Sequence, residues 1–137
     1  MNIFRPGFAP CKIALWNQEK VMSLASILVA LIALLHLYIL ILEMFLWERP
    51  AGLRAFGNTP QKAALTKVLA ANQGLYNGFL AAGLVWGLWL GNEGTQIFFL
   101  LCIAIAGIYG GLTAARKILL IQTVPACLAL ALLALGL

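Results

Sequence analysis

Charged side chains are scarce in this sequence of 137 residues. They make up 9% of it, whereas hydrophobic residues make up 64%, and the mean hydropathy is +1.00. A soluble domain carries charge on about a quarter of its residues, because its surface must be hydrated. The composition therefore excludes an ordinary soluble domain and indicates an integral membrane protein.

Residues that bind metals or form disulfides are also few. The sequence holds one histidine, four acidic residues and three cysteines. The cysteines are odd in number and lack a C-x-x-C spacing, which argues against a disulfide framework. One histidine and four scattered carboxylates cannot supply the ligands of an ordinary zinc or di-iron site within one subunit. We therefore expect no metal, and no motif indicates a cofactor.

The charges that are present are mostly basic, and the net charge is +5. Basic residues flank the apolar segments and do not gather on a separate polar domain. This placement favours anionic lipid headgroups over nucleic acid as their partner. We expect membrane lipids to be partners of this protein, and we expect no binding of nucleic acid.

Four apolar segments are each about as long as a helix that crosses the hydrocarbon core of a bilayer, which needs about 20 residues. They span residues 23–47, 68–90, 96–115 and 118–137. Their apolar runs are continuous and do not alternate with a period of two, so they are typical of helices and not of a membrane β-barrel. The sequence predicts an all-α integral membrane four-helix bundle with short loops and one longer basic loop after the first helix.

The longer loop also contains a signal for the start of a helix. Pro50, Gly52 and Gly57 favour turns in its first part. Thr59 followed by Pro60 is typical of an N-cap with proline at the first helical position. We expect the second helix to start at Pro60, outside the bilayer, and to continue unbroken into it.

The distribution of lysine and arginine predicts the orientation. The loops after the first and third segments carry six basic residues: Arg49, Arg54, Lys62, Lys67, Arg116 and Lys117. The turn at residues 91–95 and the C-terminus carry none, and the first twenty residues carry three. By the positive-inside rule, the basic loops lie in the cytoplasm. We expect a multi-pass protein of the plasma membrane (bacterial inner membrane) with both termini outside.

The three basic residues among the first twenty weaken the evidence for this orientation, because they would lie on the outer side. They also lead to a hypothesis about where translation starts. In a bacterial gene, the codons of residues 18–20 can contain an AGGAG-like ribosome-binding sequence just upstream of Met22. We hypothesise that translation starts at Met22, so that residues 1–21 are an extension outside the native protein and residues 22–137 form a single transmembrane domain. N-terminal mass spectrometry of the native protein tests this.

The stretch AANQGLYNGFLAAG, residues 70–83, combines two faces on one helix. At 100° per residue, its hydrogen-bonding side chains fall within an arc of about 140°. This polar arc consists of Asn72, Gln73, Tyr76 and Asn77. Small residues form a ladder on the other side that allows close helix packing. The ladder consists of Ala70, Gly74, Gly78 and Ala82.

Small residues and polar groups at helical spacing also occur in the other segments. The third segment has a small-residue ladder of Gly107, Gly111 and Ala115. Polar groups occur in the first, third and fourth segments, mostly in the half nearest the basic loops. We therefore expect a pocket that opens to the cytoplasm and is closed on the outer side by apolar residues. Its predicted lining is His36, Glu43, Asn72, Gln73, Tyr76, Asn77, Tyr109, Thr113 and Gln122.

Three functions fit this pattern. The leading hypothesis is a homo-oligomeric membrane protein that binds, or helps to transport, a small polar or amphiphilic molecule. The second is an enzyme acting on a lipophilic substrate with Glu43 or His36 as acid or base, although no nucleophile–base pair supports it. The third is a structural scaffold whose amides only join helices. In that case Glu43 either extends to the membrane interface or pairs with an arginine (Arg49, Arg54 or Arg116), and His36 is a core residue.

Four motifs resemble a known family. HLYILILEMFLW, AANQGLYNGFLAAG, YGGLTAARK and QTVPA occur in this order between residues 23 and 137. Together they resemble the small four-helix integral membrane proteins of the DUF1304 family (domain of unknown function 1304). The resemblance implies a four-helix membrane fold. It implies no activity or catalytic residues, because the family has none assigned.

Overall fold

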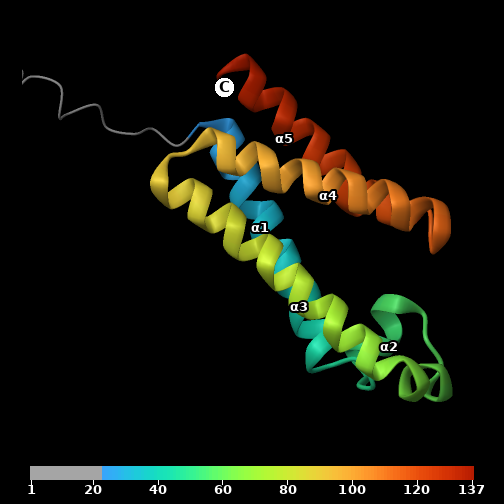
Figure 1. Ribbon diagram of the computed structural model, residues 1–137. Helices are drawn as coiled ribbons and strands as arrows, with labels where there is room; N and C mark the ends of the chain where they lie inside the picture. The colour runs from blue at the N-terminus through green and yellow to red at the C-terminus, as the bar shows by residue number, and fades with distance from the viewer. Residues whose placement is uncertain (1–22) are drawn as a thin grey trace, which may run out of the picture.

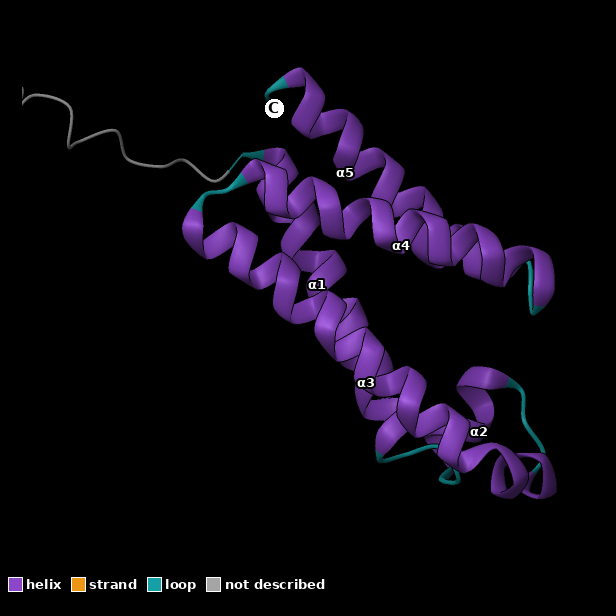
Figure 2. Cartoon of the chain, in the orientation of Figure 1, coloured by secondary structure: helices purple, strands orange, loops and turns teal. Residues whose placement is uncertain are grey.

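The computed structural model describes residues 23–137, and all the regular structure in this range is helical (Figures 1 and 2). The elements are α1 (Leu24–Met44), α2 (Pro50–Phe56), α3 (Pro60–Leu90), α4 (Glu93–Thr113), the π-helical turn η2 (Leu119–Thr123) and α5 (Val124–Leu135). The expectation of an all-α chain is confirmed for these residues. The hypotheses about the extension 1–21 and a start at Met22 lie outside them.

Within the described range, α1 and α4 are long and apolar enough to cross a membrane. Each has 21 residues, which corresponds to about 31 Å at 1.5 Å per residue and matches the thickness of a hydrocarbon core. The other two apolar segments form α3 and the η2–α5 helix. That all four segments cross a bilayer stays a prediction.

Side chains cap the starts of three helices. The Ser23, Thr59 and Asn92 side chains accept hydrogen bonds from the backbone N–H groups of Ser26, Lys62 and Thr95. Such bonds satisfy donors that the first helical turn leaves without partners. The predicted start of a helix at Thr59–Pro60 is confirmed, and α3 continues unbroken for 31 residues.

The segment before it is not the turn-rich loop that we expected. Residues 50–56 form α2, and Pro50 is its first residue. Proline is well suited to this position, because its fixed φ is helical and its missing N–H would have no partner there. Gly52 lies so close to the backbone of Leu46 that a side chain would collide with it. The glycine thus allows α2 to pack against the end of α1.

The fourth segment is also less regular than expected. Its backbone widens into η2, where the Val124 N–H bonds to the carbonyl of Leu119, five residues earlier. This widened turn ends two residues before Pro125, which cannot donate a backbone hydrogen bond. The apolar helix of residues 119–135 is therefore divided into η2 and α5.

The helices form two pairs. α1 packs along α3, and α4 packs along η2 and α5. The pairs meet at one end and diverge towards the other (Figure 1). At the joined end the N–H of Ala25 bonds to the carbonyl of Leu137 at 3.0 Å. The core lies at this end and includes Val29, Ile32, Leu84, Leu100, Ile103, Ala126 and Ala129.

The diverging end contains α2, between α3 and the α4–α5 connection (Figure 1). There Lys117 Nζ donates a hydrogen bond to the carbonyl of Ala55 in α2 at 3.0 Å. The side chain of Trp47 lies against Phe56, with ring centroids 4.8 Å apart. These contacts connect α2 to both helix pairs.

The small-residue ladders lie at contacts within this chain. Gly74 and Gly78 face α1, where a side chain at either position would meet Leu40. Gly107 and Gly111 face the fourth segment, at Thr123 and Leu119. In the same ladders Ala70 is buried, Ala115 is half-buried and Ala82 is exposed.

Candidate functional site

A hydrogen bond between α1 and α3 forms the centre of the candidate site. Asn77 Nδ2 donates to Glu43 Oε2 at 2.8 Å and also lies 3.1 Å from the carbonyl oxygen of Gln73. Both Glu43 and Asn77 are half-buried. The structure thus brings together Glu43, Asn77 and Gln73, which the sequence predicts to line one pocket. Gln73 takes part through its backbone carbonyl and not through its side chain.

Glu43 has a polar partner but no cationic one. Within residues 23–137, the ion pair that the structure forms joins Lys67 and Glu48, and Glu43 is in no ion pair. The arginine pairing that a purely structural role would favour is therefore not formed in the described part of the chain. Asn77 bonds to one carboxylate oxygen, Oε2.

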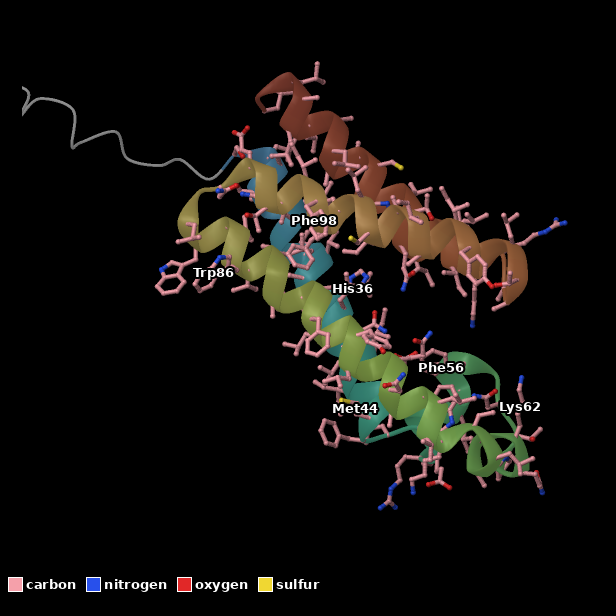
Figure 3. All side chains as sticks on the ribbon, viewed as in Figure 1. His36, Met44, Phe56, Lys62, Trp86 and Phe98 are labelled. Atoms are coloured by element: carbon pink, nitrogen blue, oxygen red, sulfur yellow. The ribbon has the colours of Figure 1, made fainter. Side chains whose placement is uncertain are left out.

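His36 lies on the same face of α1 as Glu43, because seven residues are close to two helical turns. Its side chain is fully buried, and its Nδ1 donates to the carbonyl of Ile32 at 2.8 Å. Nε2 is buried and has no hydrogen-bond partner among the described residues. Figure 3 shows the ring on the side of α1 turned towards α4. His36 is thus a core residue with one unused polar atom.

The polar arc of α3 continues the face that contacts α4. Gly83 packs against the ring of Phe99 in α4, and Tyr76 precedes Gly83 by seven residues on the same face. Away from the joined end, the two helix pairs diverge (Figure 1). Accordingly Tyr76 is 51% exposed, and Asn72 and Gln73 are exposed as well.

The predicted residues of the third and fourth segments lie on the other helix pair. Tyr109 is 71% exposed, and Thr113 donates to the Tyr109 carbonyl within α4 at 2.7 Å. Gln122 is half-buried in η2, near Gly107. The described residues form no hydrogen bond between these side chains and the polar arc of α3. The candidate site therefore has two separate walls.

Two polar side chains that are buried or anchored, Gln96 and Trp47, are not among the predicted site residues. Gln96 is 4% exposed; its Nε2 donates to the Gly87 carbonyl at 3.3 Å, and its Oε1 has no partner. The indole N–H of Trp47 reaches the carbonyl of Ala63 and the hydroxyl of Thr66, at 3.1 and 3.2 Å. A glutamine directly before an apolar run was a usable signal, whereas nothing in the sequence indicated the Trp47 bonds.

In the described part of the chain, two of the cavities lie on the α1–α3 pair. One, of about 450 Å³, is almost wholly apolar and is lined by Ala30, Ala33, Leu34, Leu37, Leu40, Gly78, Ala81, Ala82, Val85 and Leu88. The other, of about 280 Å³, is lined by Met44, Phe45, Trp47, Glu48, Arg49 and Lys67. The nine predicted pocket residues line neither. In the part of the chain that the structure describes, no three His, Cys, Asp or Glu side chains gather as a metal site would require.

Comparisons with known proteins agree with the resemblance of the motifs. The sequence profile described as "Protein of unknown function (DUF1304)" matches residues 30–134. The chain is 36% identical over 111 residues to "Uncharacterized protein YpaA" of Lactococcus lactis subsp. lactis (strain IL1403), covering 78% of this chain and 93% of that protein. No solved structure matches. The matched range contains every residue of the candidate site.

Proposed function

Since this chain belongs to the DUF1304 family of proteins of unknown function, we propose that it is a small multi-pass membrane protein that binds a small polar or amphiphilic molecule between its two helix pairs. The bound molecule contacts Glu43, Asn77 and the polar arc of α3. The family and the relative from L. lactis carry no activity that could be transferred, so the proposal is supported by the geometry.

The membrane placement is supported by helix length and charge. Among residues 23–137, α1 and α4 are the two helices that are long and apolar enough to cross. In our proposal α3 and η2–α5 cross as well, so the chain crosses four times and both termini lie on one side. A hydrogen bond joins the start of α1 to the residue after α5, and this agrees with an even number of crossings. The basic residues of the described range lie at the diverging end, which the positive-inside rule assigns to the cytoplasm of a bacterial plasma membrane.

One observation carries the ligand proposal: the Glu43–Asn77 hydrogen bond at 2.8 Å joins α3 to the last turn of α1, at the end of α1 opposite to the joined end. A carboxylate inside a membrane is costly and is usually paired or functional. Asn77 satisfies part of the hydrogen-bonding capacity of the Glu43 carboxylate. No lysine or arginine of the described chain pairs with Glu43. A molecule with a hydrogen-bond donor or a positive charge would supply the missing partner.

The joined end supports binding from the cytoplasmic side. Leu84, Leu100 and Ile103 are fully buried there and close the structure with apolar side chains. A molecule entering between the diverging pairs would therefore stop at this core. Binding, as in a sensor or a transporter subunit, requires only the structure described; transport would also require the core to open.

Native mass spectrometry from lipid nanodiscs tests the proposal, because it reports the retained ligand and the oligomeric state together. We expect the unmodified protein to retain a small molecule, and Glu43→Gln and Asn77→Ala to lose most of it. Glu93→Gln is the matched control, since it removes an exposed carboxylate at the other end. An unchanged ligand profile and unchanged thermal shifts in the Glu43, Asn72 and Asn77 variants would overturn the proposal.

A membrane enzyme acting on a lipophilic substrate is a second candidate. The unpartnered Nε2 of His36, on the same face of α1 as Glu43, favours it. The full burial of His36 argues against direct contact with a substrate. A dependence of the reaction rate on pH that changes in Glu43→Gln and His36→Gln would distinguish an enzyme from a binding protein.

A homo-oligomer is part of the proposal, because the polar arc and much of the apolar surface are exposed on a single chain. A scaffold whose amides only join helices predicts a different outcome. In that case substitution of Asn72 and Asn77 would lower stability and leave small-molecule binding unchanged.

A further inference from the structure

The cavity of about 280 Å³ at the end of α1 lies outside the candidate site. One side of it is lined by the last residue of α1 and by four residues after it: Met44, Phe45, Trp47, Glu48 and Arg49. Lys67 of α3 lines the other side. We call it the α1-end cavity. It combines an apolar part, two cationic side chains and one carboxylate.

The depth of the α1-end cavity matches lipid headgroups. α1 has 21 residues and ends at Met44, where the cavity begins; the 20 residues before Met44 correspond to about 30 Å of helix. Lys67 precedes the end of α3 at Leu90 by 23 residues, or about 35 Å. A hydrocarbon core is about 30 Å thick, so both measures place the cavity just beyond it. This step rests on the membrane placement proposed above and not on the ligand proposal.

The charges of the cavity fit a phosphate group. Lys67 Nζ lies 2.6 Å from Glu48 Oε2, and the two side chains are 63% and 40% exposed. Arg49 is a second cation, so the lining carries one net positive charge. A guanidinium group can bind two phosphate oxygens at once. An anionic group that binds Arg49 is also attracted by Lys67, while Glu48 opposes it.

The apolar part of the cavity fits a hydrocarbon chain. Phe45 is 68% exposed beside the cavity, at the end of the apolar helix. Trp47 is fixed, because its indole N–H already bonds to Ala63 and Thr66 of α3. A molecule whose phosphate binds Arg49 would therefore find a rigid wall and an aromatic surface leading into the bilayer.

We propose that the α1-end cavity binds one anionic phospholipid. Its phosphate contacts Arg49 and Lys67, and its acyl chains run along Phe45 into the membrane. This is a site for one lipid, in contrast to the diffuse attraction that every basic loop has for an anionic membrane surface.

The test compares two double variants that remove the same charge on the same side. Arg49→Gln with Lys67→Gln removes the two cations of the cavity, whereas Arg54→Gln with Lys62→Gln removes two exposed cations outside it. Native mass spectrometry in detergent, with phosphatidylglycerol and phosphatidylcholine of identical chains, measures the first lipid bound. We expect the unmodified protein and the control to prefer phosphatidylglycerol at least tenfold, and the cavity variant less than twofold.

Glu48→Gln sharpens the test, because it removes the carboxylate that competes for Lys67. We expect it to increase the affinity for phosphatidylglycerol several-fold, whereas Glu93→Gln should not. A decrease would overturn the assignment of Lys67 to the phosphate. Arg49→Lys keeps the charge and should retain part of the preference, which checks that losses are not caused by misfolding.

Two further outcomes would overturn the proposal. If both double variants lose the preference equally, the attraction is diffuse and the cavity is not a site. If millimolar inorganic phosphate or glycerophosphate displaces the lipid from the unmodified protein, the ligand is a soluble phosphate. The ligand proposal fails separately, since it depends on Glu43 and Asn77, and cysteine labelling of the two ends of the molecule tests the membrane placement.

Discussion

Asn72 and Asn77 are the same residue type on one polar arc, but they have different surroundings. Asn77 lies near the α1–α3 contact and bonds to Glu43. Asn72 lies on the far side of the arc and is exposed. The difference follows from helix geometry, because five residues rotate the side chain by about 140°. One amide therefore joins helices and the other is available to a ligand or to a second copy of the chain.

This difference predicts unequal effects on stability. Asn77→Ala should lower the free energy of unfolding by about 1 kcal/mol, because interhelical hydrogen bonds in membranes contribute about 0.6 to 2 kcal/mol. Asn72→Ala should change it by less than about 0.5 kcal/mol, as is typical of exposed positions. Unfolding in mixed micelles with increasing sodium dodecyl sulfate measures both. Equal losses in the two variants would contradict this description of the arc.

Helical periodicity predicted residues on one helix better than contacts between helices. It placed Asn77 and Gln73 on one arc, and Glu43 on one face with His36. It did not predict that Glu43 bonds to Asn77 while Tyr109 stays on the other helix pair, because such contacts depend on how the helices are rotated and how far apart they lie. A sequence pattern fixes neither quantity.

At the scale of elements, two prolines had effects that depended on their surroundings. Pro50 was interpreted as a turn former but begins α2, and Pro125 follows the widened turn η2. The same residue type favours turns, first helical turns and kinks. The long apolar elements were predicted well because their hydrophobic runs are strong signals, whereas a helix as short as α2 has little periodicity of its own.

The contact between α4 and η2 should tolerate little added volume. A Cβ atom at Gly107 would lie 2.9 Å from the backbone nitrogen of Thr123. Because backbone cannot rotate away as a side chain can, Gly107→Ala should force the helices apart and lower the free energy of unfolding by about 1 to 3 kcal/mol. Thermal denaturation in detergent measures this.

Ala106→Leu is the control for that substitution, because Ala106 is the neighbouring residue of α4 and is exposed. It adds more volume but should have almost no effect on the thermal denaturation temperature. A larger loss at Ala106 than at Gly107 would show that the glycine ladder of α4 packs elsewhere.

At the scale of the whole molecule, the fold separates two sets of loops. The α3–α4 turn lies at the joined end, together with the start of α1 and the end of α5 (Figure 1). α2 and the α4–α5 connection lie at the diverging end, where Lys117 bonds to Ala55. In the membrane placement that we propose, the two ends lie on opposite sides of the bilayer.

Cysteine labelling tests this placement. In a variant without native cysteines, Glu93→Cys should react with a membrane-impermeant maleimide in intact cells, and Arg54→Cys only after permeabilisation. The reverse result would invert the proposed orientation. Labelling of both positions from the same side would overturn the four crossings themselves, and with them the headgroup depth of the α1-end cavity.

The divergence of the two helix pairs also gives the molecule an unequal cross-section (Figure 1). In a bilayer it would occupy more area in the leaflet next to the basic loops than in the opposite leaflet. A wedge-shaped protein disturbs lipid packing least in a membrane that is already curved, with the concave face on the side of the protein's narrow end. Membrane curvature, and not only lipid charge, should therefore influence where in a cell the protein accumulates.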